Sequence, residues 1–266
     1  MAGKAAAIGA PGRLVDALIF SSTWVASAAV ALTWASALAM QVRPEPRLLG
    51  LAFAGTLFVY TVDRLRDLER DRVTSPRRSA FVERFEPWLR MQVAVAALVA
   101  LALGLGAGMR VVVVAGTVAV FGLLHRRLKH LLLAKPIYLT AAWAGVVVGM
   151  PAAHDPAARH VVWVALIVAG TVTSNVVLSN LRDDEGAAAR LGHRRALAVA
   201  AINLLPVAAL ALLGPVAVRP LVLLPLFMAG DGAGFRPSEH YGALAVDGAL
   251  LAGALGAAGW ASAAAT

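Results

Sequence analysis

The sequence predicts an all-α polytopic membrane protein, and three observations lead to that prediction. Of the 266 residues 60% are hydrophobic and only 15% are charged, whereas a soluble domain carries roughly 25% charged residues. The mean hydropathy is +0.76. Apolar runs close to the length of about 20 residues that a bilayer span needs follow one another along the whole chain. We therefore expect a single transmembrane domain over residues 1–266.

We interpret these runs as about nine transmembrane helices in one bundle. In chain order they cover residues 15–39, 47–66, 88–107, 109–124, 135–152, 159–181, 193–213, 216–230 and 241–262. The first run ends in ALTWASALAMQ, which has the AxA-like end of a signal peptide. Because its apolar part is longer than a usual signal core, we interpret it as a retained helix.

Polar stretches mark the ends of several of the later helices. The second helix ends in VDRLRDLERDR, the fifth follows HRRLKHLLLAK, the sixth ends in VVLSNLRDDE, and the seventh begins at GHRR. The ninth carries Asp247, a lone carboxylate that is costly inside a membrane span. That carboxylate could orient a polar acceptor or pair with an inner arginine.

The basic residues divide unevenly between the two sides of the predicted bundle. Most of the 24 Lys and Arg residues fall on the side of the N-terminus; the exceptions are Arg43, Arg47, Arg110, Arg159 and Arg219. The positive-inside rule then places the N-terminal side in the cytoplasm, and we expect the inner membrane of a bacterium. The net charge of +9 follows from this topology, so we expect membrane lipids and no nucleic acid as partners.

Three aspartates follow the second predicted helix at every fourth position, namely Asp63, Asp67 and Asp71. A spacing of four returns to nearly the same face of a helix, so we expect the three carboxylates to form one straight acidic stripe that rises roughly 6 Å per step. Arginines fill the gaps and could neutralise the carboxylates, as at an ordinary solvated helix end. The alternative interpretation is a binding site for a divalent metal ion.

The tripeptide LRD at residues 65–67 recurs at residues 181–183, where the sixth predicted helix ends. The two copies lie four spans apart and on the same side of the membrane. This indicates two related four-helix halves plus a final helix, and sites at the interface of such repeats are common in membrane proteins. On the sixth helix Asn175, Ser179 and Asp183 share one face.

The second and sixth predicted helices thus each end in a cluster of acidic and polar side chains. Two clusters that face each other across a bundle could hold hard cations through oxygen ligands. Magnesium usually binds one or two carboxylates together with waters and substrate phosphates, so Mg2+ ions would bridge a diphosphate. The nearby basic stretches TSPRRSAF, HRRLKHLLLAK and GHRR would supply donors for an anionic leaving group. The chain contains no cysteine, which excludes thiolate ligands and cysteine nucleophiles.

At these residues the sequence resembles the UbiA superfamily of intramembrane prenyltransferases, whose members share nine helices and two aspartate-rich motifs. The first motif corresponds to the three aspartates followed by TSPRR. The second corresponds to Asn180, Arg182, Asp183, Glu185, Gly192 and Arg194. Two positions depart from the family pattern: Ala187 stands where a carboxylate is usual, and Arg195 stands where a threonine is common. Lys135 corresponds to a lysine that precedes a span in the family.

The resemblance implies a transmembrane prenyltransferase-like domain with its active site facing the cytoplasm. It would transfer an isoprenoid chain from a prenyl diphosphate to an aromatic or other lipophilic acceptor. Asp63, Asp67, Asp71 and Asp183 would be catalytic. Mg2+ would be held by Asp63, Asp67, Asp71, Asn180 and Asp183, and the diphosphate by Arg77, Arg78, Lys129, Lys135 and Arg194.

Two other functions remain open at this point. Some relatives in the superfamily close the allylic cation on itself, which makes a terpene cyclase. A degenerate second motif would also suit a non-catalytic protein that binds or transports a prenyl diphosphate, and Ala187 favours that alternative.

Overall fold

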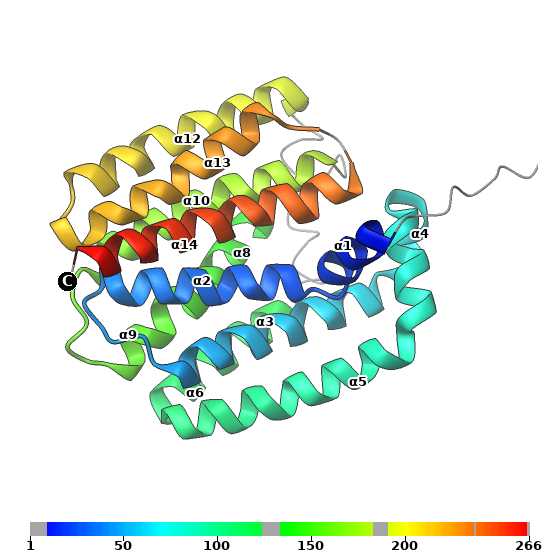
Figure 1. Ribbon diagram of the computed structural model, residues 1–266, viewed down its shortest axis with the longest axis horizontal. Helices are drawn as coiled ribbons and strands as arrows, with labels where there is room; N and C mark the ends of the chain where they lie inside the picture. The colour runs from blue at the N-terminus through cyan, green and yellow to red at the C-terminus, as the bar shows by residue number, and fades with distance from the viewer. Residues whose placement is uncertain (1–9, 124–133, 183–190, 237, 265–266) are drawn as a thin grey trace, which may run out of the picture.

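The computed structural model describes residues 10–123, 134–182, 191–236 and 238–264, and every regular element in these ranges is a helix. Successive long helices run in opposite directions along one bundle, whose axis is horizontal in Figure 1. They are α1 (Ala10–Phe20), α2 (Thr23–Ala39), α3 (Pro46–Arg66), α4 (Leu68–Thr74), α5 (Pro76–Ala107), α6 (Met109–Leu123), α8 (Ala134–Ala144), η1 (Gly145–Gly149), α9 (Met150–His154), α10 (Val161–Arg182), α12 (His193–Leu213), η2 (Val216–Val222), α13 (Leu223–Ala233), η3 (Tyr241–Val246) and α14 (Asp247–Ala263).

This architecture confirms the all-α polytopic class. Within the described residues, seven helical stretches are long and apolar enough to cross a membrane. The bent pair α1 and α2 would make an eighth, and α6 is a shorter apolar helix. Each of the nine predicted ranges overlaps one helix or a run of consecutive helices.

The first predicted helix, residues 15–39, is broken rather than straight. The axes of its two parts meet at 64°. Ser22 lies at the break with a φ of 68°, in the left-handed region, and ends the ladder of α1. As a result α1 leaves the direction of the bundle at one end (Figure 1) and packs against the first part of α5, where Phe20 meets Phe81.

The third predicted helix, residues 88–107, begins earlier than expected. Helix α5 starts at Pro76, whose fixed φ suits the first helical position. It is kinked at Phe85, which has non-helical dihedral angles, two residues before Pro87. The stretch TSPRR, which none of the predicted helices covers, therefore forms the entry and the first turn of a helix.

Helix α2 lies in the middle of the bundle (Figure 1), with buried residues on all its faces. Most of these buried side chains are alanines, and they are Ala26, Ala28, Ala29, Ala31, Ala35, Ala37 and Ala39. Small side chains let the surrounding helices approach its backbone closely, which is how membrane helices gain packing energy.

Candidate functional site

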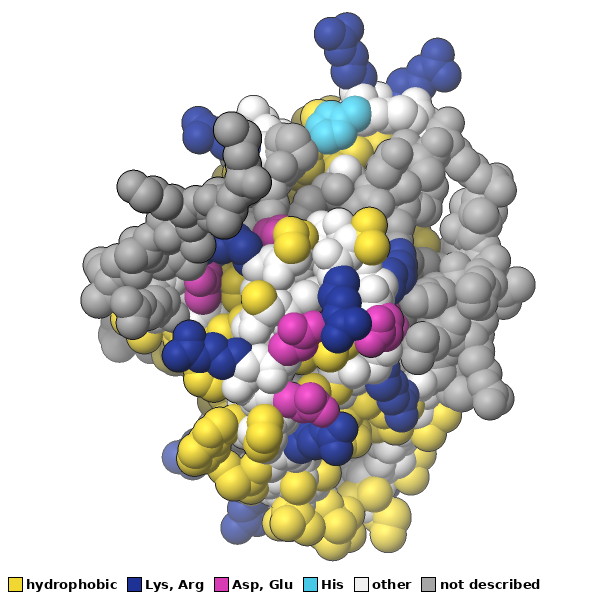
Figure 2. Space-filling view, turned by 90° about the vertical axis from the view of Figure 1, so that its right-hand side faces the viewer, with side chains coloured by type: hydrophobic (Ala, Val, Ile, Leu, Met, Phe, Trp, Pro, Cys, Tyr) yellow, Lys and Arg dark blue, Asp and Glu magenta, His cyan; other side chains and the backbone are white. Residues whose placement is uncertain are grey.

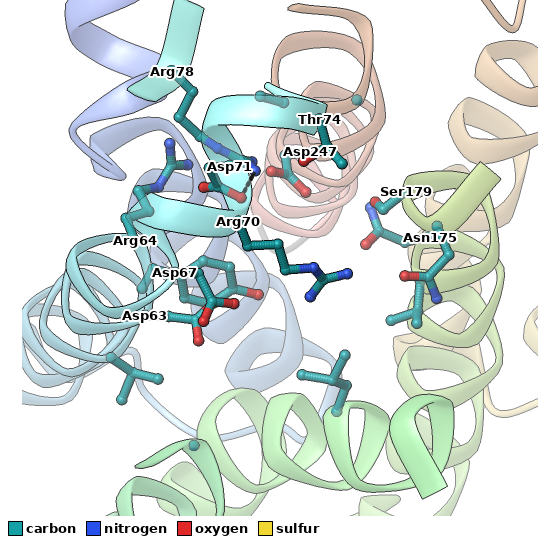
Figure 3. Close-up of a pocket in the computed structure, with 18 of the residues that line it drawn as sticks. Asp63, Arg64, Asp67, Arg70, Asp71, Thr74, Arg78, Asn175, Ser179 and Asp247 are labelled. Atoms are coloured by element: carbon teal, nitrogen blue, oxygen red, sulfur yellow. Dashed lines mark ion pairs between the residues drawn. The ribbon is translucent and has the colours of Figure 1, made fainter. Parts of the chain in front are cut away.

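A cavity of about 250 Å3 opens at the end of the bundle that carries α4. Figure 2 shows acidic and basic side chains gathered on this end. The cavity lies between α3 and α4 on one side and α10, η3 and α14 on the other (Figure 3). Its polar lining consists of Tyr60, Asp63, Arg64, Asp67, Arg70, Asp71, Thr74, Asn175, Ser179, Asn180, Arg78 and Asp247.

The three aspartates of the first motif all line this cavity, but they do not lie on one continuous helix. Helix α3 ends and α4 begins at Asp67, whose φ of −96° and ψ of 9° depart from helical values. Asp63 belongs to α3 and Asp71 to α4. The expected straight stripe is therefore wrong in detail, because the chain turns at its middle member and α4 closes over the cavity.

Asp71 is buried and forms an ion pair with Arg78, with 2.7 Å between Oδ1 and Nη2 (Figure 3). Arg78 comes from the first turn of α5, where the carboxylate of Glu239 accepts hydrogen bonds from the backbone N–H groups of Arg77 and Arg78. Glu239 thus caps α5 and fixes the place from which Arg78 reaches the cavity.

The predicted phosphate-binding residues are placed differently from one another. Arg78 lines the cavity, whereas the side chain of Arg77 turns away to Asp16, at 3.3 Å. Arg194 is exposed in the first turn of α12 and does not line the cavity. Lys129 lies outside the described residues, and so does the side chain of Lys135.

Two arginines that the sequence analysis treated only as neutralising neighbours line the cavity. The guanidinium of Arg70 points into its middle, toward α10 (Figure 3). Arg64 is partly buried, and its Nη1, which is shielded from solvent, has no hydrogen-bond partner within the described part of the chain. In the sequence, their positions between the aspartates were the feature that could have identified them as cavity residues. The direction of the Arg70 side chain follows only from the break at Asp67.

The second motif contributes the opposite wall. Helices α3 and α10 end at the same end of the bundle (Figure 1), and Asn175, Ser179 and Asn180 of α10 line the cavity. Residues from both related segments therefore line one cavity. Asp183 lies outside the described residues, and its assignment as a metal ligand stays a prediction.

A second, apolar pocket of about 90 Å3 continues from the polar cavity between α3, α6 and α8. The two share Val59, Tyr60, Gly122, Leu139 and Trp143 in their linings. At the junction Trp143 Nε1 donates a hydrogen bond of 3.1 Å to Tyr60 Oη, and the two rings meet edge to face. The combined space has a charged head and an apolar branch.

The donors in the cavity are of the kind that Mg2+ prefers, since Asp63, Asp67 and Asn180 offer carboxylate and amide oxygens. In the described ranges no group of three or more His, Asp or Glu residues is arranged to hold a metal ion. Asp63 and Asp67 could supply one or two carboxylate ligands, the number that Mg2+ usually takes together with water and phosphate oxygens.

No protein-family model matches the sequence, and a comparison with curated proteins finds no match. Among solved structures, the fold is similar to that of a digeranylgeranylglyceryl phosphate synthase in membranes, with a TM-score of 0.53 and 13% sequence identity. The likeness covers 91% of this chain and 98% of that chain. This likeness shows a shared fold.

Proposed function

We propose that this chain, which has the fold of UbiA-type proteins, transfers an isoprenoid group from a prenyl diphosphate to a lipophilic acceptor within the membrane. One observation carries the proposal: a cavity lined by carboxylates and guanidinium groups continues into an apolar pocket among membrane-spanning helices. A prenyl diphosphate has the same division into a charged head and an apolar chain.

The arginines of the cavity would bind the diphosphate and favour its departure. Arg64, Arg70 and Arg78 line the space in which the head group would lie. Guanidinium groups form strong charge-assisted hydrogen bonds to phosphate oxygens. Such donors stabilise the negative charge that develops when the allylic carbon–oxygen bond breaks, and they do so without a covalent enzyme intermediate.

Mg2+ is part of the proposal as a cofactor. The residues that would hold it are Asp63, Asp67 and Asn180, together with Asp71 and Asp183 of the expected set. When bound, it would supply positive charge to the leaving diphosphate. Because Asp71 already pairs with Arg78 at 2.7 Å, we expect its contribution to the metal to be smaller than that of Asp63 or Asp67.

The apolar pocket and the aromatic pair would handle the rest of the substrate. The pocket has an almost wholly apolar lining, which suits an isoprenoid chain and keeps water from the reacting carbon. Tyr60 and Trp143 both line the junction, where an allylic cation would form, and aromatic rings attract cations to their faces. We further propose that the cavity opens to the cytoplasm, on the basis of the positive-inside rule.

The test is pyrophosphate release by the detergent-purified protein given geranyl, farnesyl or geranylgeranyl diphosphate, with and without Mg2+ and with lipid extract as acceptor. We expect Mg2+-dependent release that Asp67→Asn abolishes. The matched control is Asp155→Asn, which makes the same change at the opposite end of the bundle. No release from any of the three donors would refute the proposal.

A second candidate is binding without turnover, and the Arg78–Asp71 pair favours it because one motif carboxylate is occupied by protein. Prenyl diphosphate that binds but releases no pyrophosphate would identify this case. Release accompanied only by a cyclic hydrocarbon or alcohol would instead identify a terpene cyclase.

A further inference from the structure

The last membrane-spanning segment begins with a π-helical turn, η3, and this turn immediately precedes Asp247. π-Helical turns are rare, and they occur frequently at functional sites because the wider turn redirects the side chains that follow it. A carboxylate inside a membrane span is also rare and usually functional. Here the two rare features, a π-helical turn and a carboxylate within a span, are directly adjacent in the sequence.

The π-helical turn is held by side chains of two neighbouring helices. Asn175 Nδ2, from α10, donates a hydrogen bond of 3.1 Å to the carbonyl oxygen of Val246. Trp24 Nε1, from α2, donates a hydrogen bond of 3.1 Å to the carbonyl oxygen of Leu244. Because these donors come from the surrounding bundle, the tertiary structure maintains the wide turn and the position of Asp247.

Asp247 lies in the wall of the cavity formed by α14, away from α8 (Figure 3). It is near enough to Tyr60 and Arg64 to interact with both electrostatically. No residue of α14 lines the apolar pocket, which is built from α3, α6, α8, η1 and α9. A prenyl chain in that pocket would thus leave the side of the cavity next to Asp247 for another molecule.

We propose that Asp247 forms the binding subsite for the acceptor, and that this acceptor carries a hydroxyl group whose proton the Asp247 carboxylate receives. This inference rests on the proposed prenyl transfer. The allylic carbon–oxygen bond of the donor breaks, and its electron pair leaves with the diphosphate. A lone pair of the acceptor oxygen forms the new bond to the allylic carbon, the O–H bond breaks, and the proton passes to the carboxylate and later to water.

Charge explains why Asp247 serves the acceptor rather than the donor. A carboxylate repels a diphosphate unless a cation lies between them, whereas it accepts a hydrogen bond from a hydroxyl group directly. The arginines supply the donor side from α3, α4 and α5, while Asp247 stands on α14. The wall formed by α3, α4 and α5 would therefore bind the anionic diphosphate, and the wall formed by α14 would bind the hydroxyl group of the acceptor.

The test separates cleavage of the donor from transfer to the acceptor. Purified protein receives farnesyl diphosphate, Mg2+ and either 4-octylphenol or 1-hexadecanol as the hydroxyl probe, and both pyrophosphate and prenylated probe are measured. We expect Asp247→Asn to lower transfer by roughly 100-fold or more, as for loss of a general base, while pyrophosphate release continues by hydrolysis. Asp247→Glu should restore part of the transfer.

The matched control is Asp155→Asn, which changes a half-buried carboxylate at the opposite end of the bundle that does not line the cavity; it should keep both activities. Equal loss of release and transfer in Asp247→Asn would overturn the subsite, because a counterion of Arg64 or a folding defect predicts that result. Unchanged transfer in the variant, or release without prenylation of either probe by the wild type, would also overturn it. No release by the wild type would instead refute the proposed function, and the subsite with it.

Discussion

Filling the apolar pocket should separate recognition of the prenyl chain from recognition of the diphosphate. Gly55 of α3 lines this pocket, and a Cβ atom built on it meets no heavy atom within 4 Å. The Cβ atom added by Gly55→Phe therefore clashes with no neighbour, and we expect the ring beyond it to compete with the isoprenoid chain for a space of about 90 Å3.

The size of the effect follows from the apolar area that the ligand loses. An isoprene unit of about five carbons, at about 0.8 kcal/mol per buried carbon, contributes about 4 kcal/mol to binding. Exclusion of most of one unit should weaken binding by roughly 100- to 1,000-fold. Inorganic pyrophosphate occupies only the charged cavity, so its affinity should not change.

The assay is equilibrium binding of geranyl S-thiolodiphosphate, a slowly cleaved analogue, compared with inorganic pyrophosphate, to both proteins in detergent with Mg2+. The matched control is Gly116→Phe on α6, an exposed glycine that has equal free space and lines none of the three described pockets. Equal weakening of both ligands, or weakening of neither, would contradict the assignment of this pocket to the prenyl chain.

Three further predictions concern the charged cavity. Asp71→Ala leaves the largely buried Arg78 without its ion-pair partner and should destabilise the protein by roughly 3 kcal/mol, which thermal unfolding in detergent measures. If the ion pair is responsible, removal of Arg78 as well should recover part of this loss. Arg70→Ala should weaken pyrophosphate binding about tenfold, the value of one hydrogen bond to a charged group, with the unfolding temperature unchanged; a large fall in that temperature would argue for a structural role. Chelation of Mg2+ should abolish pyrophosphate release and added Mg2+ should restore it, and release that continues in excess chelator would exclude the proposed metal dependence.

The positions of the helices could be predicted because the bilayer imposes a simple rule. A chain in hydrocarbon must satisfy its own backbone groups, so each apolar run of sufficient length becomes a helix. The ranges 47–66 and 193–213 differ from α3 and α12 by at most one residue at an end. Asp63 and Asp67, at the polar end of the second predicted helix, indicated a binding site there, and both line the cavity.

What could not be predicted depends on contacts between helices. The wide turn before Asp247 is held by Trp24 and Asn175, which are far from it in the sequence. Arg70 faces the cavity because the helix breaks at Asp67. The spacing of four residues between the aspartates does not indicate this break. The capping of α5 by Glu239 follows from a fold in which residues 162 positions apart meet.

The alanine-rich character of α2 has a consequence for how the protein is made. Its alanines are only weakly hydrophobic, so they give the insertion machinery little to recognise. Insertion and final packing therefore make opposite demands on the same residues. Replacement of Ala28 or Ala31 by leucine should favour entry of the nascent chain into the membrane and hinder the later closure of its neighbours around it.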